Sequence, residues 1–437
     1  MIILFSLLAG ATCALAASWI VPGAVWQDTN GKKIDAHGGM IINRGGTFHW
    51  VGHSVSNGVT PWMYSSTDLL NWQDLGAQAP GYTGTWRPKY AKPNGSFWLY
   101  AQKDRQCQVF RSSQLERGYK QAAITYLPPN NYSYSDTGMF LDPTSNTWFI
   151  LSSADHNELQ VNQILSTGYV GDKVSSLKDG PLEAPGIVYH EGVYYMIVSG
   201  KTGWRANPNK AYWSTSIKGP WAGGSDIAPP DQNTYGSQNT FELTIAGSQA
   251  TTYVYMGDAW DSKGSEASNY IWVPFTIDND SKKITLQYYP MWKVDPKTGV
   301  VSFPTTRKRY EAEHAHLKLR SRAAIIGRCE DCASKQAVHR MHSGDEVTFY
   351  NVTGLGKLEY VTFHYTVTNS EAGEAHIYVN DEVVPTNISD LNMRAGHHRS
   401  VPVPLKLQEG DVNTIRFGVT GYDDFEVMLD GIELHDD

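Results

Sequence analysis

The chain has 437 residues and a formal net charge of -8, with 36 Lys and Arg against 44 Asp and Glu. This length predicts two domains, and the negative charge argues against a nucleic acid or an anionic membrane as partner. The 25 tyrosines and 14 tryptophans instead suit polar, uncharged ligands that stack on aromatic rings, such as sugars.

The N-terminus predicts an exported protein. An apolar run covers residues 2–16 and ends in Ala14-Leu15-Ala16, a small-residue cleavage site, so residues 1–16 are predicted to be a signal peptide. The run is too short to span a membrane, and no other segment could do so. Five Asn-x-Ser/Thr sequons agree with a secreted glycoprotein.

Cysteine spacing fits the same compartment. Cys13 leaves with the signal peptide, and Cys329 and Cys332 lie three residues apart. Because no second Cys/His pair has zinc-ligand spacing, we expect a local disulfide between them rather than half of a zinc site. Cys107 is then a free, buried thiol.

An internal repeat organises residues 17–304. Aromatic strand segments recur at intervals of 49, 51, 46 and 59 residues, measured between Phe48, Phe97, Trp148, Tyr194 and Tyr253. Repeats of this length built from short strands are typical of propeller blades. We therefore predict an all-β fold with a five-bladed β-propeller over residues 17–304. A β-sandwich is the competing all-β interpretation, but it does not call for five copies of one unit.

Equivalent positions of the predicted blades carry functional residue types. The first strand of every blade surrounds the propeller axis, and counting back eleven or twelve residues from the first four aromatic markers reaches His37, Trp86, Asp136 and Glu183. The fifth blade offers Glu242 or Gln238. Charged groups around a narrow axis are costly unless they contact water or a ligand, so this pattern predicts a functional pocket.

Two carboxyl groups in one pocket suit glycosidic bond cleavage. One donates a proton to the leaving oxygen while another group activates water on the opposite face of the sugar. Glu183 lies between Pro181 and Pro185 and precedes an apolar strand, which favours it as the protonated acid, whereas Asp136 would stay ionised and hold a sugar hydroxyl or tune Glu183. The alternatives are a surface glutamate beside a turn and an aspartate that caps a turn beside Ser135.

At this point the residues carry a resemblance. The region resembles family 43 glycoside hydrolases, and in particular the branch that contains exo-β-1,3-galactanases. Seven short motifs fall in order along the chain: Ala36-His37-Gly38-Gly39, Arg87-Pro88-Lys89, Asp136 followed by Phe140, Glu183-Ala184-Pro185, Thr202-Gly203-Trp204, Gly236 to Phe241, and Tyr255 to Asp258 with Trp260.

The resemblance implies an inverting exo-hydrolase that releases galactose from β-1,3-galactan, the main chain of arabinogalactan-protein glycans. It matches Glu183 to the general acid, Asp136 to a residue that contacts the sugar or modulates the acid, and Gln238 to a glutamine proposed to position water or replace the base. Asp35 is an alternative base. The implied substrate-binding residues are His37, Trp86, Thr202, Trp204 and Asp258.

One position departs from the family pattern. Members of the branch carry a glutamate before Arg87-Pro88-Lys89, where it helps to bind the terminal galactose, and this chain has Trp86. The exchange removes a charge-assisted hydrogen bond and adds a stacking surface. Two alternatives therefore stay open: another family 43 glycosidase, acting on arabinofuranose or galactofuranose, and a sugar-binding propeller without turnover.

The composition changes after residue 304, and residues 309–437 alternate apolar and polar in short runs, which predicts a β-sandwich (jelly roll). Its first and last segments, 309–313 and 428–434, are expected to pair and to bring Glu311, Glu313 and Asp430 together as a calcium site. These end motifs resemble family 35 carbohydrate-binding modules, whose sugar site we expect in loops. We expect a monomer that acts on a polysaccharide, with one structural calcium and no cofactor for catalysis.

Overall fold

The computed structural model describes residues 17–154, 157–320, 324–368, 373–389, 398–421 and 426–436. The predicted signal peptide, residues 1–16, lies outside them. Strands are the dominant secondary structure of the described chain, which confirms the all-β prediction, and its helical segments are three short turns: η1 (Pro230–Gln232), α1 (Asn233–Gly236) and η2 (Ala312–His314). Within the described residues, no helix has the length and apolar character needed to cross a membrane.

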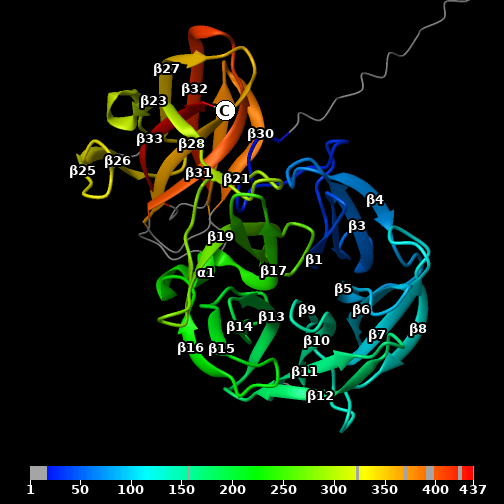
Figure 1. Ribbon diagram of the computed structural model, residues 1–437. Helices are drawn as coiled ribbons and strands as arrows, with labels where there is room; N and C mark the ends of the chain where they lie inside the picture. Colours follow the sequence, from blue (N-terminus) through cyan, green and yellow to red (C-terminus); the bar gives the residue numbers. More distant parts are fainter. Residues whose placement is uncertain are drawn as a thin grey trace, which may run out of the picture. The chain divides into compact units, whose positions relative to one another are not determined.

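The chain folds as two compact units. One comprises Val25–Gly180, and the other comprises Trp19–Ala24 and Pro181–Asp437. Each unit contains antiparallel sheets, and within every four-stranded sheet the strands follow one another in chain order (Figure 1).

The first unit contains three four-stranded sheets. The strands of the first sheet are β1 (His37–Arg44), β2 (Thr47–Ser54), β3 (Thr60–Ser66) and β4 (Gln73–Ala77). Those of the second are β5 (Trp86–Ala91), β6 (Phe97–Lys103), β7 (Gln106–Ser112) and β8 (Lys120–Thr125). Those of the third are β9 (Gly138–Asp142), β10 (Thr147–Ala154), β11 (Glu158–Ile164) and β12 (Val170–Leu177).

The second unit begins with two more four-stranded sheets. Their strands are β13 (Leu182–His190), β14 (Val193–Gly200), β15 (Lys210–Ser214) and β16 (Ala222–Asp226), then β17 (Gln238–Ala246), β18 (Thr251–Ala259), β19 (Asn269–Asp278) and β20 (Lys283–Leu286). A two-stranded ribbon follows, made of β21 (Lys293–Val294) and β22 (Val301–Ser302).

The five repeats predicted from the sequence are therefore five sheets of the same design. Each aromatic marker lies in the second strand of its sheet, and the marker strands are largely buried because both faces carry apolar side chains. Residue 183 lies in a first strand, as do residues 37, 86 and 238. Closure of the five sheets into one ring stays a prediction.

The rest of the second unit consists of two larger sheets. One has the order β25 (Ile325–Arg328), β26 (Gln336–Met341), β33 (Val427–Asp436), β28 (Leu358–Val367), β31 (His398–Lys406), with β23 (Thr305–Glu311) also paired to β33. The other has the order β24 (His316–Lys318), β27 (Glu346–Gly354), β32 (Gly410–Gly421), β29 (Gly373–Val379), β30 (Glu382–Ser389). One apolar cluster takes side chains from both sheets, including Phe363 and Phe417, whose rings lie 6.1 Å apart.

Three local predictions are confirmed in this structure. β23 pairs with β33, so the start and end of the C-terminal region are adjacent strands, with Glu311 opposite Gly431. Cys329 and Cys332 form a disulfide, and Cys107 is a free thiol that is fully buried. Burial raises the pKa of the Cys107 thiol to about 12, so it stays protonated and unreactive at neutral pH.

Candidate active site

Three of the first strands share a backbone irregularity close to the predicted site residues. The antiparallel register shifts between His37 and Met40 in β1, between Trp86 and Lys89 in β5, and between Glu183 and Gly186 in β13. Inside these shifts Arg87 and Ala184 have positive φ values of 48° and 52°, which non-glycine residues rarely adopt. Bulges of this kind re-aim side chains and concentrate near active sites.

Asp136 is held by an arginine in the first unit. The Arg87 Nε lies 3.2 Å from Asp136 Oδ1, and both side chains are largely buried. The backbone N–H of Asp136 donates to Gln102 Oε1 at 2.9 Å, and Asp136 itself has a φ of 43°. A carboxylate with a fixed guanidinium partner is suited to a defined contact with a sugar hydroxyl.

Aromatic rings line the same bulges. The His53 ring lies 6.2 Å from the His37 ring and 5.0 Å from the Trp86 ring, and the backbone N–H of Arg87 donates to His53 Nδ1 at 3.2 Å. His53 therefore connects two predicted substrate-binding residues, and the sequence analysis did not identify it. His53 lies opposite His37 in the β1–β2 register, a pairing that its residue type alone does not indicate.

Close packing at this point requires a glycine and a buried cation. A Cβ at Gly38 would lie 2.5 Å from the Arg87 Cγ, so no larger residue fits there without moving the arginine. Lys89 is fully buried, and its ammonium group donates to the backbone carbonyls of Gly38 and Gly39. The Arg87-Pro88-Lys89 motif thus fixes the backbone of β1 as well as the position of Asp136.

The carboxylate of Asp35, the predicted alternative base, accepts hydrogen bonds on both of its oxygens. Its carboxylate accepts from the hydroxyls of Ser54 and Ser56 and from the backbone N–H groups of Val55 and Ser56, at 2.6–3.0 Å. Burial by itself raises the pKa of Asp35, but the bonds from Ser56 and Val55 outweigh burial and hold that pKa below its usual value. A carboxylate stabilised in this way is a weak base, so the geometry favours a structural role.

Glu183 and Gln238 meet in the second unit. The Gln238 Nε2 donates to Glu183 Oε1 at 2.8 Å and to Ser199 Oγ at 3.0 Å, and Gln238 Oε1 accepts from the indole N–H of Trp260 at 3.0 Å. The indole can only donate, so it fixes the orientation of the amide. Gln238 is 8% exposed and Glu183 is half-buried, so the contact is partly shielded from solvent.

This contact bears on the role expected for Gln238. In inverting glycosidases the acid and the group that activates water lie on opposite faces of the sugar, and their carboxyl groups are about 6.5–9.5 Å apart. An amide hydrogen-bonded directly to the acid lies on the same side as the acid. The geometry therefore favours Gln238 as the residue that positions Glu183, rather than as the residue that activates water.

A buried asparagine supports the Glu183 bulge from behind. The Asn239 Nδ2 donates to the carbonyl of Ala184 at 3.1 Å and to Glu242 Oε1 at 2.9 Å, and its backbone N–H donates to Asn209 Oδ1 at 2.9 Å. Glu242, the other candidate from the fifth repeat, is 4% exposed and belongs to this network. Of the two fifth-repeat candidates, Gln238 is the one that contacts the predicted acid.

Of the remaining predicted residues, one packs against another aromatic ring and two make hydrogen bonds within the protein. Trp204 packs edge-to-face on Trp260, with ring centroids 4.9 Å apart. Asp258 is 2% exposed and accepts from the Thr240 hydroxyl at 2.7 Å. Thr202 donates to the backbone carbonyl of Arg205 and accepts from Asn207 Nδ2. Their contact with substrate stays a prediction, as does a pocket shared by Asp136 and Glu183.

The predicted calcium ligands lie around an arginine. Arg309 contacts Glu311 Oε1 at 2.9 Å and Asp430 Oδ2 at 2.6 Å. Glu311 Oε2 and Glu313 Oε2 are buried and make no hydrogen bond, which is expected of oxygens that bind a cation. Nevertheless, the described residues contain no group of three His, Cys, Asp or Glu side chains arranged to hold a metal ion. The donor chemistry fits calcium, and the site stays a prediction.

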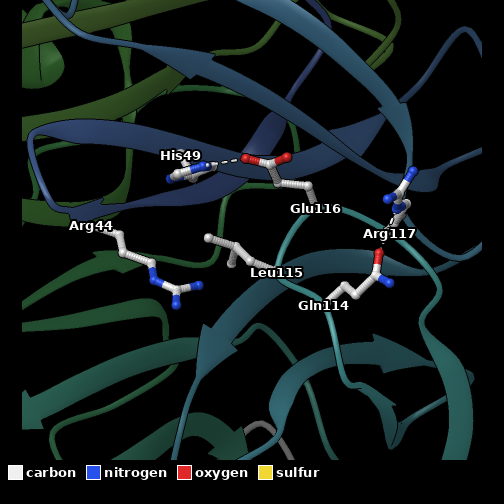
Figure 2. A pocket seen from close by; sticks show the side chains of 6 residues that line it. All are labelled: Arg44, His49, Gln114, Leu115, Glu116 and Arg117. Atoms are coloured by element: carbon white, nitrogen blue, oxygen red, sulfur yellow. Dashed lines mark hydrogen bonds and ion pairs between the residues drawn. The ribbon is translucent and has the colours of Figure 1, made fainter.

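A hollow elsewhere in the first unit contains none of the predicted residues. It has a volume of about 280 Å³ and is lined by Arg44, His49 and residues 114–117. Figure 2 shows the ring of His49 aimed at Glu116, whose Oε1 lies 2.8 Å from His49 Nε2. This contact ties β2 to the segment between β7 and β8, and it carries no sign of catalytic chemistry.

The fold and site geometry can now be compared with known proteins. The chain matches no protein-family model, and a search of curated proteins finds no match. Among solved structures, it is similar to the exo-β-1,3-galactanase of Phanerochaete chrysosporium with β-1,3-galactotriose, with a TM-score of 0.82 and 29% identity over 95% of this chain and 99% of that one. The structure of that enzyme with galactose gives a TM-score of 0.81 at 28% identity, covering 95% of this chain and 100% of that one.

A bacterial enzyme shares the fold at greater distance. The exo-β-1,3-galactanase of Clostridium thermocellum has a TM-score of 0.60 and 22% identity, covering 89% of this chain and 100% of that one. Nearly the whole chain thus has the fold of enzymes that cleave glycosidic bonds, and Glu183 and Gln238 are paired within it. The protein is a glycoside hydrolase.

Proposed function

We propose that the protein is an inverting exo-β-1,3-galactanase of glycoside hydrolase family 43. The observation that carries the proposal is the likeness over 95% of the chain to an exo-β-1,3-galactanase whose structures hold galactose and β-1,3-galactotriose. The contact between Glu183 and Gln238 gives the proposal its chemistry, because it supplies a carboxyl group whose orientation is fixed by a hydrogen bond.

In this mechanism Glu183 is the general acid. Gln238 binds Oε1 as the carbonyl oxygen of the protonated carboxyl, which leaves Oε2 to carry the proton toward the glycosidic oxygen. As the bond breaks, the proton passes to the departing sugar, and a water molecule adds to the anomeric carbon from the opposite face and releases its proton to the surrounding water. The galactose released from a β-linkage therefore first forms as the α-anomer.

The proposal includes a ring of the five sheets that brings the first strands to one pocket. Asp136, paired with Arg87, would contact the terminal sugar or tune Glu183. His37, Trp86 and Trp204 would form the walls of the pocket. An exo-acting enzyme needs such a closed pocket because it must recognise the chain end.

We further propose a secreted monomeric glycoprotein that acts on the galactan of arabinogalactan-protein glycans. The C-terminal sheets would form a carbohydrate-binding module with one structural calcium held by Glu311, Glu313 and Asp430. A linked module raises the local concentration of enzyme on a polymer, which suits a hydrolase of polysaccharides.

The purified full chain should be incubated with β-1,3-galactan and β-1,3-galactotriose. We expect galactose as the sole small product from the polymer, with the α-anomer appearing first by ¹H NMR. Glu183→Gln should lose at least about 10³-fold in kcat while its melting temperature stays unchanged. Glu191→Gln is the matched control, because Glu191 lies at the turn of the same sheet with a 78% exposed side chain. An active Glu183→Gln variant would exclude the assignment of the acid.

Trp86 favours a second candidate, a family 43 glycosidase for another terminal sugar. Its indole packs against His53 at the start of β5, where the family resemblance places a glutamate. Release of arabinose from arabinan, or hydrolysis of an aryl galactofuranoside, with no galactose from the galactan would select this candidate. Binding to galactan without any product would instead identify a sugar-binding protein.

A further inference from the structure

One outward face of the C-terminal sheets presents an organised polar hollow. The antiparallel register places four side chains in a row across four strands: His316 of β24, Thr348 of β27, Arg416 of β32 and Tyr378 of β29. Their sequence neighbours, such as Phe349 and Phe417, point into the apolar core, so this row faces outward. The hollow above it has a volume of about 230 Å³.

The charged groups of this hollow are held in place before any ligand arrives. Glu346 accepts from Lys318 Nζ at 2.9 Å and from an Arg416 guanidinium N–H at 3.2 Å. The Arg416 Cζ lies 3.9 Å from the centre of the Tyr378 ring. Stacking and ion pairing together fix the plane of the guanidinium, so its hydrogen-bond donors are preorganised.

The hollow also has an exposed aromatic wall, and a glycine lies beside two of its lining residues. Tyr350 is 54% exposed, and the ring of His316 braces it edge-to-face at 5.9 Å. Gly418 lies between Glu346 and His376 in the next cross-strand row. A Cβ at Gly418 would lie 3.6 Å from Tyr378 and 3.8 Å from Glu346, so a larger side chain would occupy the space beside these two residues.

The charges around the hollow indicate the class of ligand. Lys318 and Arg416 are balanced by Glu346 and by Asp381, which also lines the hollow. A phosphate or a uronic acid would find no net positive charge, whereas a neutral polyol would find donors, acceptors and ring faces together. These are the features that bind sugar hydroxyls and the apolar faces of sugar rings.

We infer that this hollow, defined by His316, Lys318, Glu346, Tyr350, Tyr378 and Arg416, is a binding site for a neutral oligosaccharide. The site lies on strand faces, whereas the sugar site of such a module is expected in loops. The identity of the ligand as a segment of β-1,3-galactan rests on the proposed function. Binding there would keep the enzyme on the polymer between cleavage events.

The test uses the full chain and affinity electrophoresis in gels that contain β-1,3-galactan. We expect Tyr350→Ala and Arg416→Ala to weaken retardation about five- to tenfold, because they remove the stacking face and the fixed donor. Tyr126→Ala is the matched control, since Tyr126 is 42% exposed and lies in the first unit. The kcat/KM for soluble β-1,3-galactotriose should be the same in all these variants.

Retardation that is equal in Tyr350→Ala, Arg416→Ala and the parent protein overturns the inference, even if hydrolysis is normal. A change in sedimentation behaviour of Tyr350→Ala without a change in retardation overturns it as well, because it identifies a protein contact. If the parent cleaves no β-1,3-galactan, the proposed function fails by itself. Retardation by arabinogalactan that depends on Tyr350 would in that case still support a saccharide site.

Discussion

Replacement of Gln238 by leucine tests the geometry around the proposed acid. Leucine is apolar and shorter than glutamine, so it removes the hydrogen bonds at 2.8, 3.0 and 3.0 Å to Glu183, Ser199 and Trp260. The Trp260 side chain is 4% exposed, and leaving its buried N–H without this acceptor costs about 1–3 kcal/mol of stability. Because Glu183 becomes a carboxylate as it gives up its proton in the transition state, the lost bond is worth about 1.5–3 kcal/mol there, which corresponds to a roughly 10- to 100-fold lower kcat.

The assay is steady-state hydrolysis of β-1,3-galactotriose, with thermal unfolding measured in parallel. We expect kcat to fall and KM to change little, because Gln238 orients the acid rather than the sugar. Ser199→Ala, which spares the contact with Glu183, is the control and should stay within a few-fold of the parent. A folded Gln238→Leu variant with the parent's kcat refutes this reasoning. Azide rescue of Gln238→Ala that yields α-galactosyl azide would instead identify the amide as the group that handles water.

Three further predictions concern other parts of the molecule. Trp86→Glu should raise kcat/KM on β-1,3-galactotriose about tenfold or more, because it returns a carboxylate to the terminal-sugar pocket; an unchanged or lower value would show that the indole is adapted to its substrate. Calcium should raise the melting temperature of the parent chain but not that of Glu313→Gln, and equal shifts would count against the predicted ligands. A hydrogen bond from His364 is the main cause that lowers the pKa of Glu433 to about 2. The ionised Glu433 should therefore stabilise the fold above about pH 4.5, and this stabilisation should disappear as the pH falls toward 2. In Glu433→Gln the melting temperature should depend less on pH in this range, and equal dependence in the variant and the parent would contradict the prediction.

The sheets could be predicted because their signal is local and repeated. Aromatic and β-branched segments recur at nearly constant spacing, and each marker strand is the second strand of its sheet. The disulfide and the pairing of β23 with β33 also follow from short patterns in the sequence. In each case the residues that make the contact are neighbours in the chain or carry complementary strand patterns.

Partners across sheets could not be predicted in the same way. Counting along the chain gave Asp136 the same position as Glu183, but Asp136 lies before the start of β9 and shares its positive φ with Arg87 and Ala184. A bulge changes which side chains face a given side of the sheet, and the residue types alone do not predict where a bulge occurs. For the same reason the sequence did not reveal that His53 lies between His37 and Trp86.

The bulges explain how a fold with so regular a core supports a site. In a regular strand, successive side chains point to opposite faces, so the direction of every side chain is fixed by that of its neighbours. The register shift after Glu183 releases the strand from this constraint: Ile187 and Val188 lie in the core, while Glu183 meets Gln238. Asn239 holds the carbonyl of Ala184 in the shifted position. The position of the Glu183 carboxyl group therefore depends on the backbone geometry of β13 as well as on the hydrogen bond from Gln238.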